Sequence, residues 1–216
     1  MLEIERRWRE SKISRSMAAP IGMKRDGELF YLDIHEKYHG CHGLVAGMTG
    51  SGKSEFLQEY ILSLMLNYSP DDIAFILIDF KGGDMARPFL KAPHVSATIS
   101  NLSGNMLHRA KVSLEAEIQN RQKLFNATAQ ELWIDKLDIN SWHKYMEEGK
   151  IKKKLPHLII IIDEFAQLRT QQPDFLEYLV NVAQVGRSLG IHLILATQKP
   201  SGVVSPQIWS NSRFRV

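Results

Sequence analysis

The sequence has little cysteine, little net charge and no long apolar run. Cys41 is the single cysteine among 216 residues, which excludes an internal disulfide and fits a reducing compartment. The formal net charge is only +3, so no strong overall field points to nucleic acid or to an acidic membrane surface. No stretch approaches the roughly 18 uninterrupted apolar residues that predict a membrane-spanning helix. Hydrophobic residues make up 44% of the chain, which is enough for one sizeable core.

The most informative motif has the spacing G-x-x-x-x-G-K-[S/T], which is typical of a phosphate-binding loop. Its glycines let the backbone wrap closely around a di- or triphosphate, so that N–H groups can point at the charge. Lys53 would supply positive charge to the outer phosphates, and the Ser54 hydroxyl would ligate Mg²⁺. An apolar strand at Leu44–Ala46 precedes the loop, and an apolar helix from Lys53 to Leu66 follows it. The predicted nucleotide-binding residues are Gly47, Met48, Thr49, Gly50, Ser51, Gly52, Lys53, Ser54 and Glu55.

A second motif supplies the acids that such a loop requires. The apolar run from Leu158 to Ile162 is too short to span a membrane, predicts a buried strand, and ends in Asp163 and Glu164. Asp163 would hold the magnesium shell beside Ser54, and Glu164 would orient or deprotonate a water. Many strands end in acidic residues, so this pair alone is a weak signal. Its position after a phosphate loop is what supports these two roles. The paired acids favour hydrolysis of ATP with Mg²⁺ over simple nucleotide storage.

Strands alternate with helices along the chain, which predicts an α/β fold with a mostly parallel sheet and helices on both faces. We expect residues 1–216 to form one domain, with an N-terminal extension over 1–40 and a nucleotide-binding core over 41–216. The segment Ser212–Val216 has the pattern of the first residues of a strand. We therefore expect a domain excised from a longer multi-domain protein. The other predicted strands are Glu28–Ile34, Ile73–Asp79, Val95–Ile99 and His192–Thr197, and the other predicted helices are 2–12, Asn105–Phe125, Ser141–Glu148 and Phe175–Leu189.

Several polar features allow two interpretations. Thr197 and Gln198 end a strand where a γ-phosphate sensor would lie, or they are an ordinary polar pair. Asp79 precedes Phe80-Lys81-Gly82-Gly83, which allows a tight turn near a ligand or a plain loop. His39, Cys41 and His42 lack a second pair of ligands at zinc spacing, so metal binding is not expected there. The lysines between Lys150 and Lys154 are expected to form a solvated loop.

Four segments in this order resemble the FtsK/SpoIIIE family of ring-forming motor ATPases. They are Gly47–Ser54, Ile78–Gly83, Ile160–Glu164 and Gly190–Pro200, and the resemblance covers nearly the whole chain. It implies a RecA-like P-loop ATPase fold. Within the family, the chain is similar to the EssC/EccC ATPases of type VII (ESX) secretion at His39–Gly43, Asp79–Gly83, Asp163–Ala166 and Gln198–Gly202, although Cys41 stands where a proline is usual. Those proteins are membrane-anchored, carry several ATPase domains in tandem and move WXG100-type helical hairpins.

The resemblance also implies roles for individual residues. Glu164 would be the catalytic base and Gln198 the sensor. Arg109 would act in trans on a neighbouring nucleotide, with Arg187 as the second candidate, so the isolated domain should be a weak ATPase.

The same resemblance implies partners and a location. The expected partners are neighbouring ATPase domains of the same chain, protomers of a hexameric ring, WXG100-type secreted proteins and membrane secretion components. The domain would work at the cytoplasmic side of the cell membrane. DNA is not expected as a partner, because the DNA-pumping branch usually has Asp-Pro-Lys where this chain has Asp79-Phe80-Lys81. The alternatives are a double-stranded DNA translocase and a non-hydrolysing nucleotide-binding regulatory module.

Overall fold

The computed structural model describes residues 3–79, 84–100, 104–198 and 204–216. Its centre is a six-stranded sheet with the order β5-β4-β6-β7-β3-β8, in which every neighbouring pair is parallel. A separate antiparallel hairpin, β1-β2, precedes it. The strands are β1 (Ala18–Met23), β2 (Leu29–Asp33), β3 (His42–Ala46), β4 (Ile73–Asp79), β5 (Val95–Ile99), β6 (His157–Asp163), β7 (Ile191–Thr197) and β8 (Phe214–Arg215).

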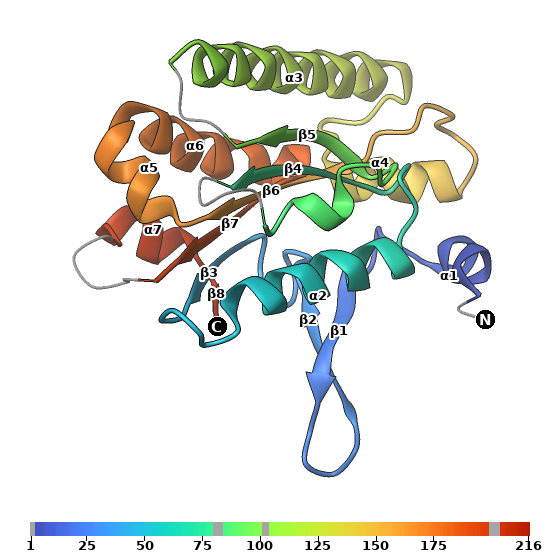
Figure 1. Ribbon diagram of the computed structural model, residues 1–216. Helices are drawn as coiled ribbons and strands as arrows, with labels where there is room; N and C mark the ends of the chain where they lie inside the picture. Colours follow the sequence, from blue (N-terminus) through green and yellow to red (C-terminus); the bar gives the residue numbers. More distant parts are fainter. Residues whose placement is uncertain (1–2, 80–83, 101–103, 199–203) are drawn as a thin grey trace.

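Helices cover both faces of the sheet, which confirms the predicted α/β class (Figure 1). One apolar core joins the sheet to α2 and the hairpin, and a second joins it to α3, α4, α6 and α7. The central strands β6 and β7 are buried at all seven of their positions, because helices press on them from both sides. The helices are α1 (Ile4–Glu10), α2 (Lys53–Asn67), α3 (Gly104–Glu131), α4 (Ile139–Glu147), α5 (Phe165–Gln171), α6 (Pro173–Gly186) and α7 (Pro206–Asn211), with short 3₁₀ turns η1 (Arg87–Phe89) and η2 (Arg187–Leu189).

The helix boundaries differ most from the prediction at the ends of α6 and α3. The helix predicted over Phe175–Leu189 is wrong at its end, because α6 stops at Gly186 and a 3₁₀ turn follows. A Cβ on Gly186 would lie 2.7 Å from the Ile191 Cβ, so the chain turns closely onto β7 there. Helix α3 continues beyond the predicted Phe125, because Ala129 on its last turns is buried. The short elements α5, α7 and β1 were not predicted.

The sheet order places β7 between β3 and β6. Ala46 pairs with Thr197, and Asp79 pairs with Asp163, so the carboxyl ends of these strands meet at one edge. Ligands of open α/β sheets bind outside that edge. Among the described residues, no helix is both long and apolar enough to cross a membrane.

The opposite, amino edge of the sheet holds a cluster of buried histidines. His157 Nδ1 and His192 Nε2 lie 2.8 Å apart on neighbouring strands. The His143 ring stacks on the His157 ring, with 5.1 Å between the ring centroids. His42 Nδ1 accepts a hydrogen bond of 3.1 Å from the Leu193 N–H. Burial lowers the pKa of His42 and of His143 to about 4, and it also lowers the pKa of the His157–His192 pair. These rings are therefore neutral in the folded protein at neutral pH.

We expect this cluster to make the domain sensitive to mild acid. The unfolded chain protonates a histidine near pH 6.5, whereas folded His42 and His143 resist protonation until about pH 4. The free energy of unfolding therefore has its full value above pH 6.5. It falls as the pH drops towards 4, by up to about 1.4 kcal/mol per pH unit for each of these buried histidines. Urea titrations at pH 7.5 and 5.5 measure this loss.

A matched pair of variants assigns the effect to burial. His42→Asn keeps an acceptor for the Leu193 N–H but cannot titrate, so it should flatten the pH dependence of unfolding. His108→Asn, at an exposed position of α3, should leave that dependence unchanged. Equal slopes for the parent and His42→Asn would contradict the assignment.

Candidate active site

The predicted phosphate loop lies between β3 and α2, and its glycines are required by its shape. Gly50 and Gly52 have positive φ values of 79° and 88°, a region that other residues rarely adopt. A Cβ on Gly47 would lie 2.2 Å from the Ser51 Oγ. Gly52 offers α2 no side-chain cap. The first N–H groups of α2 therefore point out of the helix at the loop, where an anion can accept their hydrogen bonds.

Lys53 and Asp163 form a buried ion pair. The Lys53 Nζ contacts the Asp163 Oδ1, and the two residues are only 8% and 4% exposed. Ser54, the next residue of α2, is half-buried. The loop and the acidic strand end thus meet as predicted. The pair keeps both charges compensated in the protein alone, because an unpaired charge at this depth would be strongly destabilising.

Glu164 is held by the end of β7. The Thr197 Oγ1 donates a hydrogen bond of 2.9 Å to the Glu164 Oε1, and the Gln198 N–H lies 3.2 Å from the Oε2. Glu164 is 7% exposed and has φ 65° and ψ 58°, a left-handed conformation that is rare for residues other than glycine. Strain of this kind is concentrated at functional sites. The sequence predicted Glu164 and Gln198 as site residues, but Thr197 only as half of an ambiguous polar pair.

Gln198 also contacts the phosphate loop. The Thr49 Oγ1 donates a hydrogen bond of 3.1 Å to the Gln198 Oε1, and the Gly47 N–H donates one of 3.1 Å to the Thr197 carbonyl oxygen. One hydrogen-bonded network therefore links the loop to the Glu164 carboxylate through the end of β7. A sensor of the γ-phosphate would need this location. The Lys199–Gly202 part of the motif lies outside the described residues.

Asp79 organises the chain that follows β4. Its Oδ2 accepts hydrogen bonds of 2.8 Å from the Met85 N–H and 3.4 Å from the Ala86 N–H. The predicted turn over Phe80–Gly83 lies outside the described residues. Asp79 is 2% exposed and lies beside Asp163 in register, so it belongs to the same edge of the sheet.

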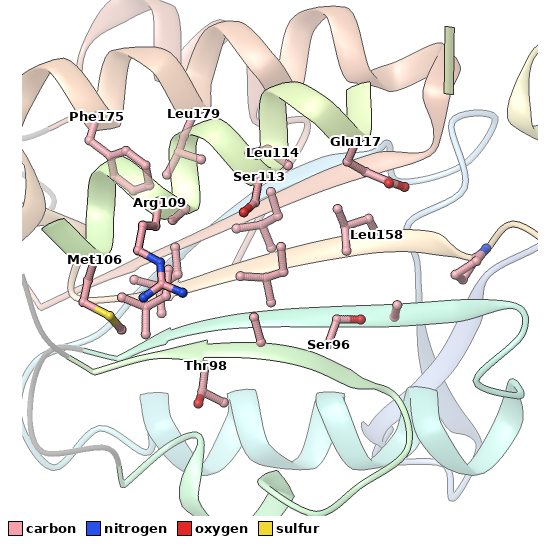
Figure 2. Close-up of a pocket in the computed structure, with 18 of the residues that line it drawn as sticks. Ser96, Thr98, Met106, Arg109, Ser113, Leu114, Glu117, Leu158, Phe175 and Leu179 are labelled. Carbon is pink, nitrogen blue, oxygen red and sulfur yellow. The ribbon is translucent and has the colours of Figure 1, made fainter. Parts of the chain in front are cut away.

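The two candidate arginines lie far from the phosphate loop. Arg109 is on α3, whose preceding strand β5 is separated from β3 by β4, β6 and β7, roughly 19 Å at ordinary strand spacing. Figure 2 shows its side chain reaching from α3 towards the sheet beside Met106, where it lines a cavity of about 630 Å³. Arg187 precedes β7 and therefore lies at the amino edge, with its Nε 3.1 Å from the Glu36 Oε2. Only Arg109 lies towards the carboxyl edge.

The remaining polar features have structural partners. His39 Nδ1 accepts a hydrogen bond of 2.9 Å from the Asp33 N–H, and burial raises the pKa of the Cys41 thiol to about 11. In the described ranges, no group of three or more His, Cys, Asp or Glu is placed to hold a metal ion. In the lysine-rich loop, Lys150 pairs with Glu148 and Lys154 with Asp71.

Comparison with known sequences identifies one family. A sequence profile described as the FtsK/SpoIIIE family matches residues 4–202. The chain is 52% identical over 215 residues to the type VII secretion system protein EssC of Staphylococcus aureus (strain N315). This match covers 100% of the chain, which spans about 14% of the length of that relative.

Comparison with solved structures agrees. The cytoplasmic domain of the type VII secretion ATPase EccC of Thermomonospora curvata aligns with a TM-score of 0.84 and 34% identity, over 94% of this chain and 24% of that one. A second structure holds ATPases 2 and 3 of EccC from the same organism in complex with a signal sequence peptide. It aligns with a TM-score of 0.78 and 22% identity, over 95% of this chain and 36% of that one, which shows a shared fold.

Proposed function

Because the chain belongs to the FtsK/SpoIIIE family of P-loop ATPases, we propose that it is an ATP-binding motor domain of a type VII secretion ATPase. In this role it couples ATP binding and hydrolysis to the export of WXG100-type proteins. One observation supports the proposal of ATP hydrolysis. The phosphate loop, Asp163 and Glu164 lie together at one edge of the sheet. The similarity to EssC and EccC supports the secretion part.

Substrate binding would exchange the partners of the Lys53–Asp163 pair. Lys53 would turn to the outer phosphates of ATP, and Asp163 together with the Ser54 hydroxyl would hold Mg²⁺. The donor set fits this metal, because Mg²⁺ prefers one or two oxygen ligands from protein together with waters and substrate phosphates. Bound Mg²⁺ supplies positive charge beside the phosphate oxygens. Each buried charge keeps a partner in both states, so neither is left uncompensated.

Glu164 and Gln198 would act on the attacking water. The Glu164 carboxylate accepts its proton while the water oxygen bonds to the γ-phosphorus and the bond to the β–γ bridging oxygen breaks. Gln198 lies between the loop and this carboxylate, where it can respond to the γ-phosphate. Arg109 lies on α3, which covers the face of the sheet opposite to α2, so it would stabilise the transition state in a neighbouring domain instead of its own (Figure 1).

We further infer the place of this domain in its protein. Residues 1–216 would be one ATPase domain, whose 1–40 extension is anchored on α2 by the Trp8 Nε1–H donating to the Met65 carbonyl and the Ser63 hydroxyl donating to the Pro20 carbonyl. Its partners would be the next ATPase domains, ring protomers forming a hexamer, WXG100-type cargo and membrane secretion components, at the cytoplasmic face of the membrane.

ATP binding should depend on Lys53. Lys53→Ala removes a charged hydrogen bond to phosphate worth roughly 1.5–3 kcal/mol, which is about a ten- to hundredfold loss of affinity for ATP·Mg. Fluorescence titration with a labelled ATP analogue measures this loss. Unchanged affinity would mean that the nucleotide site is assigned to the wrong residues.

A double variant separates binding from stability. Lys53→Ala also leaves Asp163 buried without its partner, which should lower the melting temperature. Lys53→Met with Asp163→Asn removes both charges, so stability should recover while ATP affinity stays low. If ATP affinity recovered together with stability, the loss in Lys53→Ala would reflect folding instead of a lost phosphate contact.

A further inference from the structure

Thr197 connects the phosphate loop with Glu164 through two different groups. Its carbonyl oxygen accepts the Gly47 N–H at 3.1 Å, and its Oγ1 donates to the Glu164 Oε1 at 2.9 Å. The residue is fully buried at the end of β7, between the strands that carry the loop and the acids. Its backbone position is therefore set by the sheet, and its side chain is directed towards β6.

The Glu164 side chain needs such a contact to be held in one place. Its backbone is in the left-handed region at the N-cap of α5, outside the strand, so the β6 ladder does not orient it. The carboxylate is directed towards β7, the neighbour of the loop strand β3, by the Thr197 hydroxyl and the Gln198 N–H. A catalytic group must be held close to its productive geometry by a supporting shell of hydrogen bonds.

We propose that Thr197 is a positioning residue for ATP hydrolysis, whose hydroxyl holds the Glu164 carboxylate towards the phosphate loop. This inference rests on the proposed function of Glu164 as the base. The Thr197 hydroxyl takes up one of the about four acceptor sites of a carboxylate, and the Gln198 N–H lies near both oxygens, so the contact with Thr197 does not itself prevent Glu164 from accepting the proton of the attacking water. The contact thus orients the base without blocking it.

The hydroxyl, not the size of the side chain, is the group that matters. Thr197→Val keeps the shape and the backbone bond to Gly47 but removes the donor to Glu164. We expect kcat to fall about 10²-fold, the scale of a small misplacement of a catalytic group, while the KM for ATP changes less than about twofold. Thr197→Ser keeps the hydroxyl and should recover most of kcat. As a control, Thr170→Val removes an exposed hydroxyl that donates to the Ala166 carbonyl on α5, and it should leave kcat unchanged.

The experiment measures kcat and KM on the full chain under conditions where it assembles, with melting temperatures for each variant. If Thr197→Val does not fold, Thr197→Ala compared with Thr197→Ser gives the same comparison. A parental kcat for Thr197→Val, or equal losses in the Val and Ser variants, would overturn the proposal. Turnover by Glu164→Gln itself would instead refute the proposed base, so the two failures are distinguishable.

Discussion

Replacing Glu164 with Gln should stop ATP turnover while ATP still binds. General-base catalysis contributes about 10²–10⁴-fold to rate, and the amide cannot accept a proton from water. It can still accept the Thr197 hydroxyl hydrogen through its oxygen, so the end of β7 should keep its arrangement. Phosphate release by the assembled protein measures turnover, and titration with a labelled ATP analogue measures binding.

The control for this variant is an acid that lies away from the site. Glu177→Gln changes the charge by the same amount at an exposed position on α6, and it should leave both turnover and binding unchanged. Parental hydrolysis by Glu164→Gln would remove Glu164 from the mechanism. Gln198 and Asp79, at the same edge of the sheet, would then be the groups to test.

Removal of Arg109 should slow hydrolysis in a neighbouring domain instead of its own. An arginine that acts in trans contributes about 10³–10⁵-fold in other nucleotide hydrolases. Helix α3 covers the face of the sheet opposite to α2, the helix that follows the phosphate loop, so we expect Arg109 to serve a neighbouring site instead of its own (Figure 1). The isolated domain should consequently bind ATP yet hydrolyse it slowly, at a rate that rises with protein concentration.

Mixing two inactive populations tests the direction of this effect. One population carries Glu164→Gln with Arg109 intact, and the other carries Arg109→Ala with Glu164 intact. Neither should turn over ATP alone, whereas mixed assemblies or a tethered pair should recover activity. Lys123→Ala, at an exposed position further along α3, is the matched control and should behave as the parent. Absence of recovery in verified mixed assemblies would count against Arg109, and the same test would then be applied to Arg187.

Local sequence was sufficient to predict where the phosphate loop and the strand that ends in Asp163 lie along the chain. Gly50 and Gly52 are required by their positive φ values, and a Cβ on Gly47 would meet Ser51 of the same loop, so the spacing of these glycines carries the information directly. The apolar runs that became β4 and β6 are buried on both faces, a property that a continuous run of apolar residues expresses without knowledge of the partners. The less regular boundaries, such as the end of α6 at Gly186, depend on contact with β7 and were predicted less well.

The sequence by itself was enough to predict the phosphate loop, the two acids at the end of a buried strand, and a mostly parallel sheet. Only the tertiary structure decided which of these residues touch. The insertion of β7 between β3 and β6 brings Thr197 against Glu164. It also gathers His157 and His192 at the opposite edge. Strand order follows from the joint packing of helices on both faces, a long-range property that no single segment encodes.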